Sequence, residues 1–372
     1  MEKIRVLEMM GEGISHGGEE AFISNLLINM DTEGLEIDWL TPYECKNQFY
    51  REQLEKKGGR VFEFGLSYVP GKSRKHIIAP LNTFFSEHHY DVVHIHSGSI
   101  SVLSYASQIA SKHGIKKIIV HSHLGGKKSV KSAIVKAAFS PLMVRYPTIY
   151  MACSMEAANM KFPPQIVNNQ LILINNGINL EKYIYVPETN VRIRTELNIP
   201  QDARVIGHVG RFNPEKNHKY IIECFRKVLE KERNCYLLFV GDGELLEDIK
   251  QKTRELSIED NVRFAGYVNN ISDYYKAMNL FVFPSLYEGF PISALEAQAT
   301  GIPCIISDKI DKDTAVCPNV FSLPIENSNV EKWVDTICEH LYEAPMEQQA
   351  LLKSKGFDIK DTANQIRKIY ME

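Results

Sequence analysis

The chain has 372 residues, of which 44% are hydrophobic and 24% are charged, and its formal net charge is −3. This composition is ordinary for a soluble globular protein, and the length fits two domains of roughly 150–200 residues each. No apolar stretch approaches the roughly 18–20 residues that a membrane-spanning helix needs. Neither the charge nor the composition supports nucleic-acid binding.

The beginning of the chain and its cysteines indicate the compartment. The first segment, "MEKIRVLEMMGEG", is too short and too acidic for a signal peptide and is typical of a first core strand. The seven cysteines are odd in number and show no C-x-x-C spacing. This pattern is typical of buried thiols in a reducing compartment. We therefore expect a cytoplasmic protein.

Short β-branched and aromatic runs alternate with helix-length amphipathic segments along the chain. In the first half the expected strands are residues 4–9, 36–41, 60–65, 91–96, 117–123 and 148–154. In the second half they are residues 204–210, 235–241, 262–267, 280–285 and 303–307. Such near-continuous apolar runs, with helical patterns between them, indicate parallel sheets covered on both faces. The sequence thus predicts an α/β protein with two doubly wound units in series.

The boundary between the two units is expected near residues 176–190. The segment "LILINNGINLEKYIYVPETN" is interrupted there by Asn-Asn-Gly and a later proline. We place the first domain at residues 1–180 and the second at residues 181–372. The last segment, about 357–371, has the apolar spacing of a helix. It is either the last helix of the second unit or a helix that crosses back to the first.

One part of the first domain is strongly basic. No acidic residue occurs between Asp91 and Glu156. Four of the lysines in this stretch lie close together among apolar residues: Lys127, Lys128, Lys131 and Lys136. Two interpretations are open. A basic amphipathic segment of this kind lies on an anionic membrane surface, or it is a solvated helix whose apolar face packs on the sheet.

The segment "FVFPSLYEGFPISALEAQATGIPCI", residues 281–305, joins two expected strands through a loop and a helix. Proline suits the first helical turn, so we expect the helix to begin at about Pro291. The free N–H groups after Pro291 form an anion site, and Gly289 lets the backbone approach a ligand closely. Glu288 and Glu296 stand eight positions apart, so they can contact different hydroxyls of one polar ligand.

A second candidate site is the loop "RFNPEKN", residues 211–217, which follows an apolar run and precedes a helical pattern. It places Arg211 and Lys216 five positions apart. A surface pair of cations is usually solvated, but two cations at a strand-to-helix junction also indicate a bound anion. Lysine offers a point charge and arginine a planar fork, so each can serve a different phosphate oxygen.

These segments together resemble retaining glycosyltransferases of family 4 with the GT-B fold, and the resemblance covers nearly the entire chain. Residues 281–305 resemble the E-x7-E signature of that family, and "HVGRFNPEKN" resembles its Gly-Arg-x-x-x-x-Lys-Asn loop. "LFVGDGEL" is similar to the following strand and turn, and "HGGEE" at 16–20 is similar to the Gly-Gly-x-Glu loop. "NNGIN" resembles the interdomain motif, with Asn179 in place of an acid. The resemblance implies two Rossmann-like domains facing each other across a cleft.

The resemblance also implies roles for individual residues. Arg211 and Lys216 would hold the diphosphate of a nucleotide-sugar donor, Glu296 the ribose, and Glu288 the donor sugar as a catalytic residue. The remaining implied donor-binding residues are Gly17, Gly18, Gly289, Phe290, Pro291, Ile292 and Ser293. We find no D-x-D-type acidic cluster placed to hold manganese, so we expect neither a metal nor another cofactor.

The strand "KIIVHSH" ends with two histidines, His121 and His123, whose side chains point to the same side because strand residues alternate. In the family a histidine at this strand end contacts the donor sugar from the first domain. His123 is the better match, since it stands at the strand-to-loop junction, and we assign it as a catalytic residue. His121 is interpreted as a core histidine, although the choice between the two stays open.

The implied function is transfer of a hexose or N-acetylhexosamine, with retention at the anomeric carbon, from a nucleotide-sugar to a saccharide acceptor. Members of this family commonly use UDP-linked donors and polyprenyl-diphosphate-linked acceptors. We therefore expect such a donor and acceptor here, in exopolysaccharide, capsule or cell-surface glycan synthesis. Such an acceptor would bring a cytoplasmic enzyme to the inner face of the cell membrane. Two alternatives are a non-hydrolysing UDP-N-acetylglucosamine epimerase and a non-catalytic nucleotide-sugar-binding subunit. Hydrolysis of the donor indicates a transferase, binding without turnover indicates a non-catalytic subunit, and isomerisation of the donor indicates an epimerase.

Overall fold

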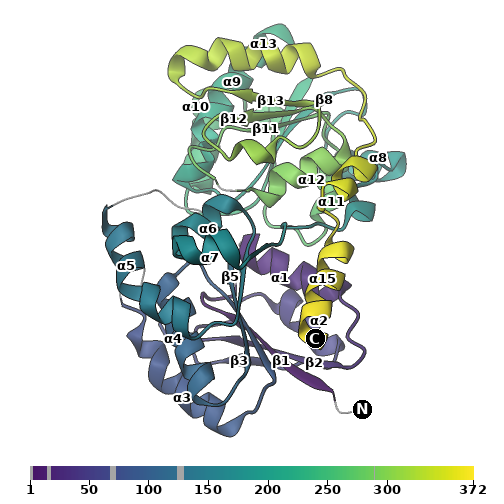
Figure 1. Cartoon of the computed structure of the whole chain (residues 1–372). Helices are drawn as coiled ribbons and strands as arrows, with labels where there is room; N and C mark the ends of the chain where they lie inside the picture. The colour runs from purple at the N-terminus through teal and green to yellow at the C-terminus, as the bar shows by residue number, and fades with distance from the viewer. Residues whose placement is uncertain (1–2, 15–17, 68–72, 124–129, 289) are drawn as a thin grey trace. The chain divides into compact units, whose positions relative to one another are not determined.

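The computed structural model describes the chain except residues 1–2, 15–17, 68–72, 124–129 and 289 (Figure 1). Its contacts divide the chain into two compact units. Unit 1 comprises residues 1–177 and 356–372, and unit 2 comprises residues 178–355. Each unit contains a parallel β-sheet whose strands are connected by helices. The predicted α/β fold class with two Rossmann-like domains is therefore confirmed.

The sheet of unit 1 has the strand order β3-β2-β1-β4-β5-β6-β7. Its strands are β1 (Ile4–Met10), β2 (Leu35–Thr41), β3 (Val61–Glu63), β4 (Val92–His96), β5 (Lys117–Ser122), β6 (Ile149–Ala152) and β7 (Leu171–Leu173). All neighbouring strands run parallel. Their order reverses between β1 and β4, and in open α/β sheets ligands bind beyond the carboxyl ends of the strands at such a point.

Two groups of helices cover the sheet of unit 1 (Figure 1). One group is α3 (Ile78–Glu87), α4 (Ile100–Lys112) and α5 (Val130–Arg145), and the other is α1 (Gly18–Asn29), α2 (Gln48–Lys56) and α15 (Ile359–Met371). The short helices α6 (Met155–Lys161) and α7 (Pro164–Asn169) flank β6. Because strand side chains alternate, Leu7 and Met9 join the apolar core under α3 and α4. Glu8 points to the opposite face.

The sheet of unit 2 has the strand order β10-β9-β8-β11-β12-β13. Its strands are β8 (Arg204–Val209), β9 (Cys235–Val240), β10 (Val262–Phe264), β11 (Leu280–Phe283), β12 (Cys304–Ser307) and β13 (Val320–Leu323). Its helices are α8 (Pro187–Glu196), α9 (His218–Lys231), α10 (Leu246–Glu255), α11 (Ile271–Lys276), α12 (Ile292–Thr300), α13 (Val330–His340) and α14 (Gln349–Ser354). All neighbouring strands run parallel here too.

Two edge strands were not predicted from the sequence. β7 lies in the segment that we interpreted as a linker, and β13 has only four residues. The last helix, α15, belongs to unit 1 and packs on α1. A Cβ atom at Gly177 would lie 2.9 Å from the backbone of Ile359. Gly177 is the glycine of the Asn-Asn-Gly motif. Because it has no side chain, α15 can approach the chain closely where residues 1–177 end.

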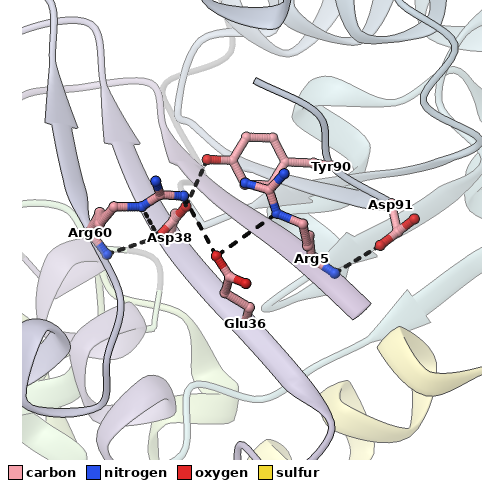
Figure 2. Close-up of polar contacts among 6 residues, drawn as sticks. All are labelled: Arg5, Glu36, Asp38, Arg60, Tyr90 and Asp91. Carbon is pink, nitrogen blue, oxygen red and sulfur yellow. Dashed lines mark hydrogen bonds and ion pairs between the residues drawn. The ribbon is translucent and has the colours of Figure 1, made fainter. Parts of the chain in front are cut away.

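Figure 2 shows polar contacts at β1 and β2 among Arg5, Glu36, Asp38, Arg60, Tyr90 and Asp91. Asp38 is 1% exposed and accepts hydrogen bonds from Arg60 Nη2 at 2.6 Å and from the Tyr90 hydroxyl at 2.8 Å. Burial would raise the pKa of Asp38, but the bonds from Arg60 and Tyr90 outweigh it and lower the pKa. The carboxylate thus ties β2 to the segments that precede β3 and β4.

Candidate functional site

The cation loop of unit 2, residues 211–217, is a compact turn between β8 and α9. Asn213 begins a short 3₁₀ turn, and its side chain accepts a hydrogen bond from the Lys216 amide at 3.2 Å. Pro214 occupies the first position of that turn. Asn217 takes a left-handed conformation, with φ of 56°, and starts α9. Asparagine tolerates this conformation better than most residues, so the motif encodes the geometry that presents Lys216.

Backbone hydrogen bonds join three loops at the carboxyl ends of β8, β9 and β11. Phe212 N–H donates to the Asp242 carbonyl at 2.9 Å, and Leu286 N–H donates to the Glu215 carbonyl at 2.8 Å. A Cβ atom at Gly241, where φ is +137°, would lie 2.1 Å from the Gly210 carbonyl oxygen. Only glycine permits this contact. The Gly-Asp-Gly turn after β9 therefore serves to hold the cation loop.

Lys216 and Glu288 are brought together by these loops. Lys216 Nζ lies 2.7 Å from Glu288 Oε1 and 4.5 Å from the centre of the Phe283 ring. The two side chains are 14% and 23% exposed. Arg211 is placed differently, because its side chain is 73% exposed and its Nε lies 3.7 Å from Glu244 Oε2. The loop thus presents one sheltered cation and one cation in solvent.

Helix α12 begins at Ile292, with Pro291 as its N-cap, one residue later than expected. Its first intrahelical bond runs from Ala294 N–H to the Pro291 carbonyl, so the amides of Ile292 and Ser293 precede the helical hydrogen-bond ladder. Phe290 is half-buried beside this end. Gly289 lies outside the described residues. The helix ends at Gly301, whose φ is +83°, as its sequence predicted.

Glu296 lies within α12 and is 8% exposed. Its Oε1 accepts a hydrogen bond from the Tyr183 hydroxyl at 2.5 Å, and its Oε2 accepts one from the Tyr275 hydroxyl at 3.0 Å. Burial raises the pKa of Glu296 to about 7, although the two tyrosine hydrogen bonds act to lower it. The carboxyl group therefore titrates near neutral pH, which is unusual and typical of functional sites.

The candidate residues of unit 1 belong to a buried polar network on the sheet face that α1 and α15 cover. Glu8 Oε2 lies 2.7 Å from His96 Nε2, and His96 Nδ1 lies 2.8 Å from His123 Nε2. His94 Nε2 lies 3.2 Å from His121 Nδ1. The structure thus brings both predicted histidines into one network, with His121 fully buried and His123 8% exposed.

Three histidines of this network have lowered pKa values, which favours their neutral forms. Burial, together with the charge of His94, lowers the pKa of His96 to about 4. Burial and the neighbouring histidines lower the pKa of His121 and of His123 well below the usual value. Of the two glycines predicted in the adjoining loop, Gly18 is the first residue of α1 and Gly17 lies outside the described residues.

The network also contains a group that could be considered for a metal ion. Among the described residues, His94, His96 and His121 each offer a ring nitrogen, and these atoms lie within 4.8 Å of one another. Both ring nitrogens of His94 and of His96, however, already have hydrogen-bond partners in the protein. A metal would have to displace these partners, so the arrangement as it stands is a hydrogen-bonded network.

Two further acidic residues of unit 1 were missed by the sequence reasoning. Burial raises the pKa of Glu12, in the loop after β1, to about 7, even though Ser97 Oγ donates to Glu12 Oε1 at 3.0 Å. Burial and the charge of Glu12 raise the pKa of Glu19 well above the usual value. The signal was present in the acidic residues of "GEG" and "HGGEE", two short segments that follow the first strand in the sequence.

Most of unit 2 matches a family of known proteins. Residues 190–355 match the family model described as glycosyl transferases group 1. Unit 2 carries a glycosyltransferase domain. This domain contains the predicted donor residues Arg211, Lys216, Glu288 and Glu296. The resemblance to glycosyltransferases stated from the sequence is therefore confirmed.

Two relatives that match most of this chain are also named as glycosyltransferases. The chain is 26% identical to "Putative glycosyltransferase EpsF" of Bacillus subtilis (strain 168), over 98% of this chain and 96% of that protein. It is 29% identical to "UDP-Gal:alpha-D-GlcNAc-diphosphoundecaprenol alpha-1,3-galactosyltransferase" of Escherichia coli, over 72% and 70% of the two chains.

A solved structure shows the same fold. Anabaena Alr3699/HepE, in a crystal structure with UDP and glucose, has a TM-score of 0.78 over 99% of this chain and 100% of that chain, at 18% identity. The glycosyltransferase domain and unit 1 thus have the GT-B type of α/β fold. The residues of unit 2 that the resemblance missed are Tyr183 and Tyr275, since isolated tyrosines carry no spacing signal.

Proposed function

We propose that the chain is a retaining glycosyltransferase that moves a hexose or N-acetylhexosamine from a UDP-linked donor to a saccharide acceptor. The observation that carries this proposal is the 2.7 Å contact between Lys216 Nζ and Glu288 Oε1 in the glycosyltransferase domain. A cation suited to a diphosphate lies there beside a carboxylate suited to sugar hydroxyls. The name of the E. coli relative, which specifies UDP-Gal, and the HepE complex with UDP and glucose support the choice of donor.

In this proposal the diphosphate replaces Glu288 as the partner of Lys216. Arg211 contacts a second phosphate oxygen from the solvent side, and the amides of Ile292 and Ser293 donate at the N-terminus of α12. Negative charge builds on the leaving diphosphate as its bond to the anomeric carbon breaks. The three positive features stabilise that charge, so the mechanism needs no metal ion.

The other predicted residues take the remaining parts of the donor. Glu296 binds the ribose hydroxyls, Glu288 the hydroxyls of the transferred sugar, and His123 the same sugar from unit 1. Gly18, Phe290 and Pro291 contact the diphosphate or the sugar through backbone atoms. Gly17 and Gly289 are also assigned to donor binding from the sequence motifs, and they lie outside the described residues. An acceptor hydroxyl forms the new bond on the face that the leaving group departs, and its proton passes to the leaving phosphate oxygen.

We further propose that the acceptor is a polyprenyl-diphosphate-linked saccharide and that unit 1 meets it at the membrane surface, in polysaccharide synthesis. The name of the E. coli relative, with its diphosphoundecaprenol acceptor, supports this choice. Helix α5 exposes apolar side chains to solvent, with Val130 79%, Ile134 64% and Val144 42% exposed. Such residues beside lysines suit an anionic interface. No helix within the described parts of the chain is long and apolar enough to cross a bilayer.

The four lysines predicted for this surface differ in their environment. Lys127 and Lys128 lie outside the described residues, as does the side chain of Lys131. Lys136 is half-buried, and its Nζ donates to the Asn159 carbonyl at 2.6 Å. Lys136 is thus partly engaged within unit 1. We therefore assign the larger part of the membrane contact to the apolar residues of α5 and to the lysines that precede it.

A thermal-shift screen against a panel of nucleotide-sugars tests the donor. A ligand at 100 times its Kd stabilises the folded state by about 2.7 kcal/mol, so the correct donor raises the melting temperature measurably and related nucleotides less. Product analysis follows for the ligand that binds. Release of free sugar, or transfer to an added acceptor, supports a transferase. Isomerisation of the donor indicates an epimerase, and binding without turnover indicates a non-catalytic subunit.

A further inference from the structure

Tyr275 of α11 connects the carboxyl group of Glu296 to the first turn of α12. Its hydroxyl oxygen lies 3.0 Å from Glu296 Oε2 and 2.9 Å from the Ser293 carbonyl oxygen. Both neighbours accept hydrogen bonds, whereas a phenol has a single proton to donate. The hydroxyl can therefore make a full hydrogen bond to only one of them at a time. Tyr275 is fully buried, so bulk water does not supply a second donor.

The charge of Glu296 decides which acceptor receives the Tyr275 proton. An ionised carboxylate attracts a donor more strongly than a neutral carbonyl does, so Tyr275 then donates to Glu296. A proton added at Oε2 reverses this bond. Glu296 then donates to the Tyr275 oxygen, and Tyr275 donates to the Ser293 carbonyl. A carbonyl oxygen has two lone pairs, so this new bond leaves room for a helical partner in α12.

Other titratable groups face this pair from two further elements that pack on α12. From the 3₁₀ turn Leu180–Tyr183, the Tyr183 hydroxyl donates to Glu296 Oε1 at 2.5 Å, and the charge of Lys182 favours the ionised carboxylate. From β12, Cys304 lies near Tyr275, and burial raises the pKa of its thiol well above the usual value. Because Tyr183 donates to the other oxygen of the same carboxyl group, it is the matched control for Tyr275.

We propose that Tyr275 is a positioning residue that transmits the state of Glu296 to the first turn of α12. A ligand hydroxyl that donates to the carboxylate takes up part of its negative charge and weakens its hold on Tyr275, as a proton does. The Tyr275 proton then turns to the Ser293 carbonyl and holds this turn. The inference rests on the proposed function, which assigns Glu296 to the ribose and the first amides of α12 to the diphosphate. It deepens that function, because recognition of the nucleoside prepares the diphosphate site.

The first experiment follows the Ser293 carbonyl of the free protein by NMR. The chain contains two Ser-Ala steps, Ser132-Ala133 and Ser293-Ala294. Labelling serine with ¹³C at the carbonyl and alanine with ¹⁵N therefore gives two correlated signals, and the one from α5 is an internal reference that Ser132→Thr assigns. We expect the Ser293 signal to move downfield as pH falls through about 7, because the new hydrogen bond draws electrons from the carbonyl carbon. The reference signal should not move.

Three variants separate the hydrogen bond from the charge. Glu296→Gln should abolish the titration, which identifies the titrating group. Tyr183→Phe should keep the full amplitude, with a higher midpoint because the ionised carboxylate has lost a donor. Tyr275→Phe should lose most of the amplitude, since only the electric field of the carboxylate then reaches the carbonyl. A Ser293 signal that does not titrate in the wild type, or that titrates equally in Tyr275→Phe, overturns the proposal. This readout does not depend on any activity.

The second experiment adds uridine or UDP at about pH 8, where most of Glu296 is ionised. Each should move the Ser293 signal downfield in the wild type and in Tyr183→Phe, but not in Tyr275→Phe. The ratio of the Kd of uridine to the Kd of UDP should fall about fivefold in Tyr275→Phe, the scale of one hydrogen bond, and stay unchanged in Tyr183→Phe. Equal ratios in the two variants overturn the coupling. If the wild type binds neither UDP nor any UDP-sugar, the proposed function fails instead, while the titration of the free protein still decides the role of Tyr275.

Discussion

Lys216 Nζ and Glu288 Oε1 lie 2.7 Å apart, so two residues predicted to serve different parts of one donor neutralise each other in the free protein. The pair is sheltered but not fully buried, with 14% and 23% of the two side chains exposed. In the proposed function, a donor diphosphate exchanges places with Glu288, and the released carboxylate then becomes available to the sugar. Without its contact with Glu288, Lys216 would be an unpaired cation and would attract other anions in the cell.

Replacing the cations of the loop should abolish transfer. We expect Lys216→Ala or Arg211→Ala to lose at least about 10²-fold in activity, the scale of removing one charge that stabilises a transition state. Both variants should stay folded by circular dichroism and thermal unfolding. Lys219→Ala, which removes an exposed cation three residues away, is the control and should retain activity. Near-normal kcat/KM in Lys216→Ala would rule out the assigned role.

Glu288→Gln should separate binding from turnover. If Glu288 competes with the diphosphate for Lys216, as the proposed function requires, this variant should bind UDP at least as tightly as the wild type. Its rate of sugar transfer should nevertheless fall, since the carboxylate also contacts the transferred sugar. Calorimetry with UDP and a kinetic assay measure the two effects. A loss of UDP affinity in Glu288→Gln would show that the ion pair does not compete with the donor.

Donor affinity should depend on pH through Glu296. The ionised carboxylate is the better acceptor for ribose hydroxyls, and the pKa of this group is raised to about 7. Affinity for a UDP-sugar should therefore rise about tenfold between about pH 6 and about pH 8. The diphosphate of a UDP-sugar does not titrate in this range, which makes it a better probe than UDP. Glu296→Gln should flatten the profile, and an unchanged slope in that variant would refute the assignment.

The same group predicts a trend in stability. Its pKa of about 7 in the folded state lies above the ordinary glutamate value of 4.5, so the folded state holds the Glu296 proton more tightly than the unfolded chain does. The contribution of Glu296 is then fully present below about pH 4.5, decreases as pH rises to about 7, and is lost above that. Urea unfolding of wild type and Glu296→Gln across this range checks the sign. The difference between them should change only within that window.

Activity should survive chelation by EDTA. In the proposed function, Lys216, Arg211 and the N-terminus of α12 supply the positive field that a divalent cation supplies in other transferases. We expect the initial rate of the purified chain to be unchanged after dialysis against EDTA. Complete loss of activity that manganese or magnesium restores would contradict this prediction.

Binding to membranes should depend on both lysines and apolar residues of α5. Each lysine near an anionic surface contributes about 1 kcal/mol, so liposome co-sedimentation should rise with anionic lipid and fall with salt. Replacing Lys127, Lys128, Lys131 and Lys136 by glutamine should weaken binding. Ile134→Ser, at a position that is 64% exposed, should weaken it without changing the charge. If the wild type ignores anionic vesicles at low salt, a soluble acceptor is the better reading.

Much of the fold could be predicted because the buried strands of parallel sheets are continuous apolar runs in the sequence. β7 and β13 could not be predicted, because short edge strands are only partly buried and have no long apolar run. The cation loop could be placed, because Pro214 and Asn217 determine its turn. The partners of the side chains in this loop could not be predicted, because the contact of Lys216 with Glu288 joins two loops that are far apart in the chain.

The same limit explains the missed residues of the candidate site. Glu296 was predicted from its spacing to Glu288, but the hydroxyls of Tyr183 and Tyr275 reach it from other elements. Likewise, a pair of histidines at the end of one strand was visible, whereas their connection to Glu8 depends on the register of neighbouring strands. Such relationships arise from packing, and no local pattern in a single sequence records them.

The assignment of α15 to unit 1 has a consequence for synthesis of the chain. Unit 2 is one continuous segment, residues 178–355, and is complete before the final residues leave the ribosome. Unit 1 begins first but ends last, because Tyr370 supplies the hydroxyl that bonds to Glu8, 362 positions earlier. The face of β1 that carries Glu8 therefore lacks one of its covering helices until the residues of α15 have been synthesised. A premature stop that removes only the last helix would leave a finished unit 2 attached to an unfinished unit 1.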